Sequence, residues 1–595
     1  MGCSRQDREA SAIPVPIKER SSSELFREFL DENYAVDMAR APYTASYRGI
    51  KTYHDQWNSA AEAHLQDTRE INEARLQQMN DYDPQAMNDA NRLSWNVYQA
   101  DLRRRLASDE FRHHKFVIHQ YRGPHTKAAS NLINIHTVSD RDDALAYIGR
   151  LNNIGPWFDQ VIEQLRIRQE KNFLLADWQY AQMIETSNNI ISGIPYDNDD
   201  NDGDDSILWS DFQTKVADLD ITNSERLKLL ADAKEAMLKM VEPAYRRLIT
   251  ELEKQAEIAP DADGVWKFDQ GDDFYQERLR WFTTTDLSAD EIHNIGLREV
   301  ARLHKEMKAI MLEVGFEGSF AGFLVHMRED ERFYYPTTEQ GREAYLAEAV
   351  RLIDVMRTRL PDVFAVFPES QLIVKRVEAF REQSAGKAFY QRPSPDGSRP
   401  GIFYANLYDM ANMPKYQLEA LAYHEGIPGH HMQRAISVEL DGIPEFQRYA
   451  TFTAYTEGWG LYTEQLGREM GFYEDPYSNF GRLAMELWRA CRLVVDTGIH
   501  RKRWTREQAI DYLVINTPNS VGDSTNAIER YIAMPGQATA YMIGKLEIVR
   551  LREKAIEKMG DKFDIRQFHD VVLKDGPVPL SLLEEKVDAM IEAKM

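Results

Sequence analysis

The chain has 595 residues, far more than a single hydrophobic core needs, so we expect at least two lobes. Its net charge of −24 argues against nucleic acid as a partner, because binding phosphates needs a basic surface. Only two cysteines are present, which excludes a disulfide framework, and no run of 18 apolar residues predicts a membrane span.

The N-terminus begins MGCSRQDREA and continues as a polar stretch. A bacterial lipoprotein signal ends in a small residue followed by the cysteine that receives the lipid. Gly2-Cys3 resembles the end of such a signal without its apolar part, and the alternative is a frayed terminus with an incidental cysteine. We therefore expect residues 1–20 to be a flexible tether. We expect the protein in the bacterial cell envelope, in the periplasm, touching the membrane only through a lipid on Cys3.

Most of the chain has helical patterns. Ser or Thr followed three residues later by Glu or Gln is the capping box that begins many helices. The pattern occurs at Ser21 and Glu24, at Ser288 and Glu291, and at Thr337 and Gln340. Apolar residues recur at helical spacing after each box, and Pro361 should end the third helix. We expect a helical half over residues 21–280 and a second half over 281–595.

One stretch of the second half breaks the helical pattern. LIVKRVEAF, KAFYQRP and GIFYANLYD are rich in β-branched and aromatic residues, and Pro and Gly separate the last two. The sequence therefore predicts a small sheet over about residues 371–408. This sheet lies directly upstream of a histidine cluster.

The cluster is YHEGIPGHHMQ, residues 423–433. In the zinc signature H-E-x-x-H the two histidines are four residues apart and share one face of a helix. His424 and His430 are six apart, which on a straight helix is about 240° of rotation and ~9 Å of rise. They could not share an ion on such a helix.

The helix cannot be straight at this point. Pro428 has no N–H, and its ring would clash with the carbonyl of His424. Gly426 and Gly429 permit unusual backbone angles on either side. The sequence predicts an interruption at Gly426–Gly429 that brings His430 to His424. The alternative is a helix end followed by a loop, with histidines that cap or pack.

A third metal ligand is available in FTAYTEGWGLYTEQL. Glu457 follows His430 by 27 residues, in a helical segment one helix downstream. Two histidines and one glutamate form a zinc site with a fourth position for water. Trp459 and Tyr462 could pack around it. For Glu457 alone, a solvent-facing helix position is the alternative.

With these residues identified, the sequence resembles a bacterial domain-of-unknown-function family, many members of which are described as lipoproteins. The matching segments are RPGIFYANL, YHEGIPGHHMQ, YTEGWGLY, LVVDTGIH and RYIAMPGQATAYMIGKLEI. That family is grouped with gluzincin-type zinc metallopeptidases. The resemblance implies a mainly α, large helical metallopeptidase-like fold with a deep cleft, and a small β-sheet beside the active-site helix. GHHMQ also resembles the H-E-x-G-H of thimet-oligopeptidase-like enzymes, which favours His430 over His431 as second ligand.

Zinc chemistry assigns further roles. Glu425 would be the general base. Tyr541, Tyr531 and His500 are candidates to stabilise an oxyanion, as Tyr and His do in the enzymes that the chain resembles, and packing is the alternative for each. Arg530 could grip a substrate carboxylate, or form a surface ion pair. Asp496 could orient His431 or a ligand.

The predicted sheet could bind substrate directly. A strand such as GIFYAN at an edge of the sheet can pair with an extended peptide. Tyr404 and Asn406 on this strand are therefore substrate-binding candidates.

The leading hypothesis is zinc-dependent hydrolysis of short peptides, of oligopeptidase or carboxypeptidase type. The alternative is a non-catalytic peptide- or metal-binding lipoprotein on the same fold. A third hypothesis is a zinc amidase acting on cell-wall peptides. Glu425 favours an enzyme, because binding alone does not need a base. A serine hydrolase is not supported, because the chain has no G-x-S-x-G.

Overall fold

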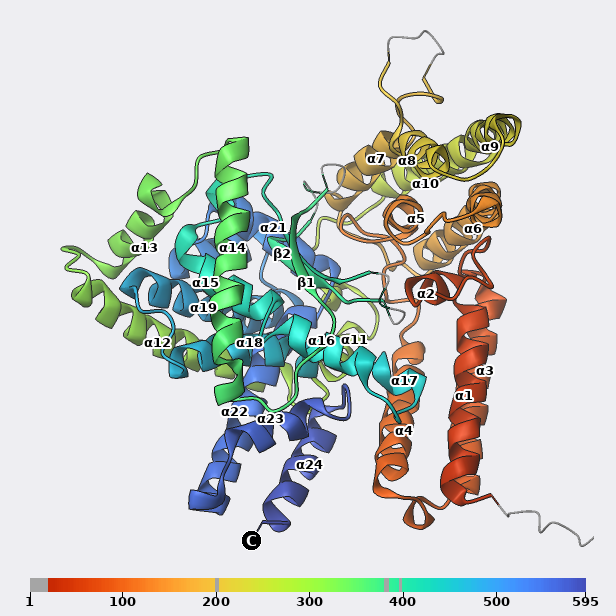
Figure 1. Ribbon diagram of the computed structural model, residues 1–595. Coiled ribbons are helices and arrows are strands. Elements are labelled where there is room, and N and C mark those ends of the chain that lie inside the picture. Colours follow the sequence, from red (N-terminus) through yellow and green to blue (C-terminus); the bar gives the residue numbers. More distant parts are fainter. Residues whose placement is uncertain are drawn as a thin grey trace, which may run out of the picture.

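The computed structural model describes residues 20–197, 203–378, 382, 385–394, 397 and 399–594. This part of the chain is mainly helical, with one three-stranded sheet, which confirms the prediction of a mainly α fold with a small sheet (Figure 1). None of its helices combines the length and apolar character needed to cross a membrane. Cys3 and the rest of the predicted tether up to residue 19 lie outside the described residues.

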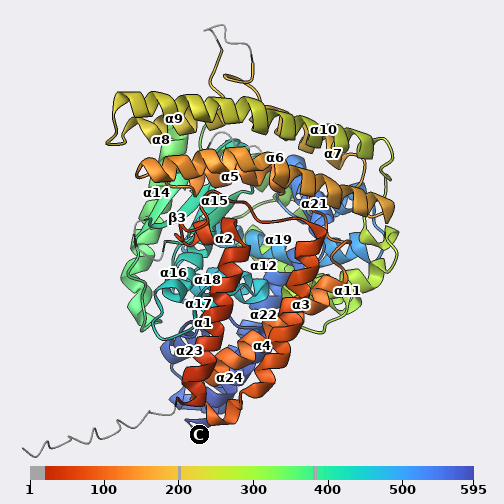
Figure 2. The same cartoon turned by 90° about the vertical axis from the view of Figure 1, so that its right-hand side faces the viewer.

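The first half is helical throughout and forms two groups (Figures 1 and 2). The first group is α1 (Ser22–Arg40), α2 (Pro42–Tyr47), α3 (Glu62–Gln78) and α4 (Asp89–Glu110). The second is α5 (Pro124–Asn134), α6 (Arg141–Glu170), α7 (Gln179–Ile190), α8 (Ile207–Ala217), α9 (Asn223–Ala236) and α10 (Glu242–Ala256). A core that includes Phe158, Phe212 and Tyr245 holds the second group together.

The second half surrounds a long central helix. α11 (Gly271–Thr283) spans the predicted boundary between the halves, and α12 (Ala289–Glu313), α13 (Phe320–Glu329) and α14 (Glu339–Arg359) follow it before the sheet. Those after it are α15 (Lys415–Glu425), α16 (His430–Glu439), α17 (Glu445–Arg448), α18 (Thr453–Glu469), α19 (Pro476–His500), α20 (Arg506–Asn516), α21 (Val521–Ala533), α22 (Ala540–Met559), α23 (Ile565–Leu573) and α24 (Leu580–Glu592). α19 is buried from Phe480 to its end and packs against α12 and α15.

Two of the three predicted capping boxes are confirmed. Both hydrogen bonds of the box are present at the starts of α1 and α12. The third box is wrong by one residue, because α14 begins after Thr338, whose hydroxyl accepts from the amide of Gly341 at 3.2 Å. α14 ends at Arg359, and Pro361 lies in the single 3₁₀ turn that follows.

The sheet lies where the sequence predicts it, but its strand order differs from the expectation. β1 (Leu372–Arg376), β3 (Gly401–Ala405) and β2 (Ala388–Gln391) lie side by side in that order. β3 pairs in parallel with β1 and antiparallel with β2, and all five of its residues are buried. GIFYAN is therefore the central strand, and the prediction that it offers an edge to a peptide is wrong.

Glycines allow α18 and α22 to touch backbone to backbone. A Cβ on Gly458 would lie 2.4 Å from the carbonyl carbon of Gly544. A Cβ on Gly544 would lie 1.9 Å from the carbonyl oxygen of Ala454. No side chain fits between the two helices at this crossing, so their separation is fixed by glycine.

This contact gives a stability prediction. Gly544→Ala must push the helices apart, and we expect it to lower the free energy of unfolding by about 1–3 kcal/mol or more. Gly522→Ala is the matched control, because Gly522 is exposed on α21 with no atom nearer than 4.0 Å to an added Cβ. It should stabilise by up to about 1 kcal/mol. Unfolding midpoints measure both, and a Gly544→Ala protein as stable as wild type would contradict the contact.

Candidate metal centre

The predicted interruption of the histidine helix is confirmed. α15 ends at Glu425 and α16 begins at His430, with Gly426 and Gly429 as the flanking cap residues. The amide of His431 donates to the carbonyl of Gly426 at 3.0 Å, so the break keeps the two helices in contact. At Gly429 a Cβ would lie 2.0 Å from the carbonyl oxygen of His424, so only glycine fits there.

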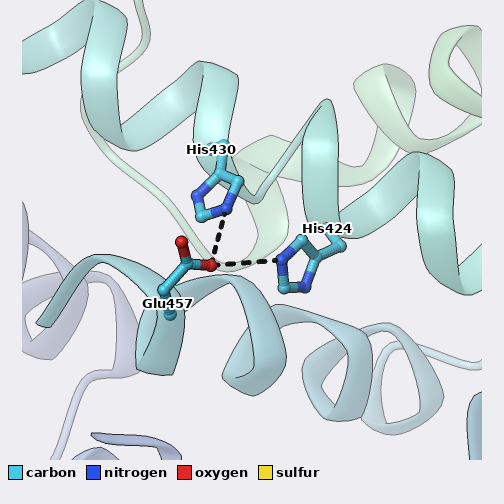
Figure 3. Close-up of side chains that lie close together, drawn as sticks. All are labelled: His424, His430 and Glu457. Carbon is cyan, nitrogen blue, oxygen red and sulfur yellow. Dashed lines mark ion pairs between the residues drawn. The ribbon is translucent and has the colours of Figure 1, made fainter. Parts of the chain in front are cut away.

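Three side chains converge across this break (Figure 3). Glu457 Oε2, on α18, lies 3.3 Å from His430 Nε2 and 3.8 Å from His424 Nε2. One ligand atom from each of the three residues lies within 4.8 Å of the other two. Tetrahedral zinc with bonds of about 2.1 Å separates its ligand atoms by about 3.4 Å. The three residues can therefore hold such an ion with small adjustments.

His431 points to the sheet and not to Glu457. Its Nδ1 shares a hydrogen bond of 3.0 Å with the Tyr390 hydroxyl, and its Nε2 lies 3.1 Å from the carbonyl oxygen of Ser370. Gly401 leaves room for it, because a Cβ there would lie 2.5 Å from the His431 ring. Of the two adjacent histidines, His430 is the one positioned as a ligand.

Glu464 supports the first histidine and was not identified from the sequence. Its Oε1 lies 2.8 Å from His424 Nδ1, which leaves Nε2 to face Glu457. Glu464 is seven residues after Glu457, two helical turns along the same face of α18. Gly460 lies between them, and a Cβ there would be 2.7 Å from the His424 ring. This spacing of Glu, Gly and Glu is the signal that could have revealed the second glutamate.

The electrostatics of the cluster favour positive charge among its ligands. Burial lowers the pKa of His424, but Glu457 and Glu464 outweigh it and raise the pKa to about 9. Burial raises the pKa of Glu457, but His430 and His424 hold it well below its usual range. A metal ion would meet the same demand for positive charge.

Glu425 is the last residue of α15 and follows His424 directly. Its side chain is only 6% exposed, and its Oε2 has no hydrogen-bond partner among the residues that the structure describes. A buried carboxylate oxygen without a partner is costly. A water or ligand at the centre would supply the missing donor.

Trp459 holds the break against α18. Its indole N–H donates to the carbonyl of Pro428 at 3.0 Å. Tyr462, also expected near the centre, packs on Trp459, and its hydroxyl shares a hydrogen bond with His569 at 2.7 Å. Both aromatic residues therefore support the backbone of the site, and their polar atoms bind Pro428 and His569 and not the three candidate ligands.

The predicted tyrosines gather around an arginine that the sequence did not single out. The Tyr531 hydroxyl accepts from Arg492 Nε at 2.8 Å. The Arg492 guanidinium lies 4.4 Å from the centre of the Tyr541 ring, and that of Arg530 lies 5.3 Å from the Tyr531 ring. The structure thus brings Tyr531, Tyr541 and Arg530 together.

The structure does not support the catalytic role predicted for His500. Its Nε2 lies 3.0 Å from the carbonyl oxygen of Tyr531, and its Nδ1 accepts from the amide of Val265 at 3.3 Å. Both ring nitrogens are committed to backbone, and burial lowers the pKa of His500 to about 4. A neutral, fully engaged imidazole has no proton free for an oxyanion.

Asp496 was expected to orient His431 or a ligand, but its carboxyl binds other residues. Its Oδ1 accepts from the Tyr275 hydroxyl at 2.6 Å and from the amide of Gly536 at 3.0 Å. Burial raises the pKa of Asp496 to about 7 against these hydrogen bonds. This carboxyl fixes α19 to α11 and to the turn before α22.

The two residues predicted on the strand are engaged in the fold. Asn406 donates to the carbonyls of Glu382 and Ala385 at 2.7 and 3.0 Å. Tyr404 is buried and stacks on Phe389 with ring centres 4.9 Å apart. The structure therefore gives both residues a packing role in the sheet.

Comparison with known proteins places the chain in a family. The pattern of a bacterial family of unknown function, DUF885, matches residues 42–587. The chain belongs to this family. The DUF885 assignment confirms the predicted domain-of-unknown-function family, and among curated proteins none matches the chain.

Two solved structures share the DUF885 fold of this chain. One is a crystal structure described as a "putative lipoprotein" from Colwellia psychrerythraea, 30% identical, with a TM-score of 0.90 over 96% of this chain and 100% of that one. The other is a "putative lipoprotein of unknown function" from Shewanella oneidensis, 17% identical, with a TM-score of 0.70 over 95% of this chain and 99% of that one. At that identity the second shows the fold alone.

The raised pKa of Asp496 gives a prediction about stability and pH. Between about pH 4 and pH 7 the folded protein keeps a proton on Asp496 that the unfolded chain has lost. This contribution to stability is fully present below about pH 4 and is lost as pH rises to about 7. It is on the order of 4 kcal/mol, and Asp496→Asn should remove it. Denaturant unfolding of both proteins across this range measures the difference, and parallel curves would contradict the assignment.

Proposed function

We propose that the chain is a zinc-dependent peptidase that hydrolyses short peptides. The observation that carries the proposal is the convergence of His424, His430 and Glu457, with Glu425 Oε2, which has no partner in the described part of the chain, beside the first ligand. Two histidines and a glutamate form the donor set of catalytic zinc sites that keep one position open. A carboxylate next to the first histidine is the base that such sites use.

The surrounding residues support a metal at this place. The contact of His424 Nδ1 with Glu464 is the carboxylate–histidine arrangement that orients metal-binding imidazoles and raises their basicity. His430 Nδ1 has no hydrogen-bond partner within the described ranges, which leaves a place for a water or a substrate group. Bound zinc would polarise a peptide carbonyl and lower the pKa of water nearby.

The residues of the chain then perform hydrolysis as follows. Glu425 accepts a proton from the water whose oxygen attacks the carbonyl carbon, and it returns that proton to the leaving nitrogen. One water is consumed, and the products are a carboxylic acid and an amine. Tyr541, next to Arg492, is the candidate donor to the developing oxyanion.

We also propose where in the cell the protein acts. The similar structure from Colwellia psychrerythraea is described as a "putative lipoprotein", and Cys3 after Gly2 is a cysteine that could carry the lipid. We infer a cell-envelope protein tethered through Cys3. Peptides in that compartment would be its substrates.

Zinc binding is tested by two glutamates of α18. Glu457→Gln removes an anionic ligand and should weaken zinc binding the most. Glu464→Gln can still accept from His424 Nδ1, so we expect only the roughly 10–100-fold loss typical of an outer partner. Glu469→Gln is the control, because Glu469 lies at the end of α18 and pairs with Arg552 of α22, so this change should not alter zinc affinity. Titration against a competing chelator measures all three, and unchanged affinity in Glu457→Gln would refute the ligand set.

Catalysis is tested at Glu425. Glu425→Gln keeps the shape of the side chain but cannot accept the proton, so turnover should fall by about 10²-fold or more while zinc stays bound. The measurement is cleavage of a mixture of short peptides, with zinc content determined on the same samples. A variant as fast as wild type would exclude this mechanism. If wild type holds zinc and cleaves no peptide, the chain is a binding protein on the same fold.

A further inference from the structure

Helix α19 carries two buried arginines beside the candidate metal centre. Arg489 and Arg492 are three residues apart and therefore lie on one face of the helix. The two residues are only 7% and 8% exposed. Arg530 lies next to them, and Tyr531 and Tyr541 pack between the guanidinium groups.

Within the described residues, neither arginine has a carboxylate that pairs with it alone. Among the residues that the structure describes, Arg492 forms no ion pair, and Arg489 reaches only Glu464, at 4.0 Å. Oε1 of Glu464 is already engaged by His424 Nδ1 at 2.8 Å, and its buried Oε2 has no hydrogen-bond partner in the described residues, so no hydrogen bond joins this carboxylate to Arg489. Glu486, one turn before Arg489, is occupied by Lys545, Arg302 and Arg482. Two buried positive charges therefore remain largely uncompensated.

Both guanidinium groups also have unsatisfied hydrogen-bond donors within the described residues. Arg489 Nε and one terminal nitrogen of Arg492, NH1, are buried without a hydrogen-bond partner in the described part of the chain. The other contacts of the pair go to Met485 and to the Tyr531 hydroxyl. Burying a charged group with unused donors is costly, and cation–π contacts with two tyrosines offset only part of that cost. An anionic ligand would satisfy both the charge and the donors.

The arginines lie close enough to the metal centre to act on the same molecule. Glu464 contacts both His424 and Arg489, and the charge of Glu425 also acts on Arg489. Tyr541 is one helical turn before Gly544, which touches Gly458, the residue after Glu457. These contacts place the arginines and the metal ligands within the length of one short peptide.

We propose that Arg489 and Arg492 bind the C-terminal carboxylate of the peptide substrate, with Arg530 and Tyr541 beside them. The inference rests on the proposed function and narrows it to peptides with a free C-terminus, cleaved near that end. Arginine suits this task because its planar fork matches a carboxylate in a bidentate manner. In a chain with a net charge of −24, a buried positive pair is also a selective place for an anion.

Binding to an inactive protein tests the inference apart from catalysis. The probes are dansyl-labelled tetrapeptides of mixed sequence, each prepared as the free acid and as the C-terminal amide. They are titrated into full-length, zinc-loaded Glu425→Gln protein. We expect the acids to bind roughly 30-fold or more tightly than the amides, the range for one partner of a buried charge pair. Equal binding of the two forms, or no binding of either, would overturn the inference.

The residue assignment is tested by Arg492→Gln in the same background. It should abolish the preference for the acid and leave binding of the amide unchanged. Arg482→Gln is the matched control, because Arg482 is equally buried on α19 but is paired with Glu486. It should keep the preference. A preference for the acid that survives Arg492→Gln would refute the assignment. If Arg492→Gln fails to fold, Arg489→Lys takes its place. The ratio of acid binding to amide binding is then compared between that variant and the Glu425→Gln protein that keeps both arginines.

Hydrolysis of the acid and amide peptides by the wild-type protein distinguishes the carboxylate site from the peptidase function. If wild type hydrolyses amides as fast as acids, the inference fails and the peptidase function stands. If it hydrolyses neither, while the Glu425→Gln protein still prefers the acids, the peptidase function fails and the carboxylate site stands.

Discussion

The candidate site depends on a break in one helix that is too tight for any residue but glycine at its second end. The carbonyl oxygen of His424 occupies the space that a Cβ on Gly429 would need. Trp459 then binds the carbonyl of Pro428 and fixes the break to α18. Without this short segment, two histidines six residues apart would point to different sides of a helix. With it, they face the same glutamate.

α18 is the element on which the rest of the site is arranged. One face carries Glu457, Gly460 and Glu464. Glu457 faces the two histidines, Gly460 leaves room for the ring of His424, and Glu464 orients that ring. Gly458, one residue further round, brings α22 into backbone contact. Because α22 carries Tyr541, the same helix sets the distance between the metal ligands and the groups that surround the arginines.

Local chemistry explains what the sequence could predict. Proline and glycine act on the residues next to them, so the interruption at Gly426–Gly429 followed from the chain itself. Two capping boxes followed for the same reason. The choice between His430 and His431 depends on where the new helix restarts, since neighbouring residues of a helix point about 100° apart. The resemblance to peptidases favoured His430, and the structure places that residue toward Glu457.

Long-range arrangement explains what the sequence missed. β3 is central because β1 pairs with it in parallel from the far side, and no property of GIFYAN alone shows this. His500 is a plausible catalytic residue by type, but the carbonyl of Tyr531, 31 residues later, takes its Nε2. In the sequence, Arg489 and Arg492 are indistinguishable from solvent-exposed charges on a helix, and only the packing of the neighbouring helices shows that they are buried. In each case the partner comes from a distant segment.

Charge balance links the metal ligands to the arginines. Glu425, Glu457 and Glu464 bring three negative charges into one buried region, and Arg489 and Arg492 bring two positive ones. Arg530 lies beside the pair, so the arginines balance these carboxylates, and the contacts of Glu457 and Glu464 with His424 raise its pKa to about 9. A divalent cation would add two positive charges next to arginine donors that have no partner among the described residues. A carboxylate of a ligand would offset part of this charge, so the ion and the anion would each stabilise the binding of the other.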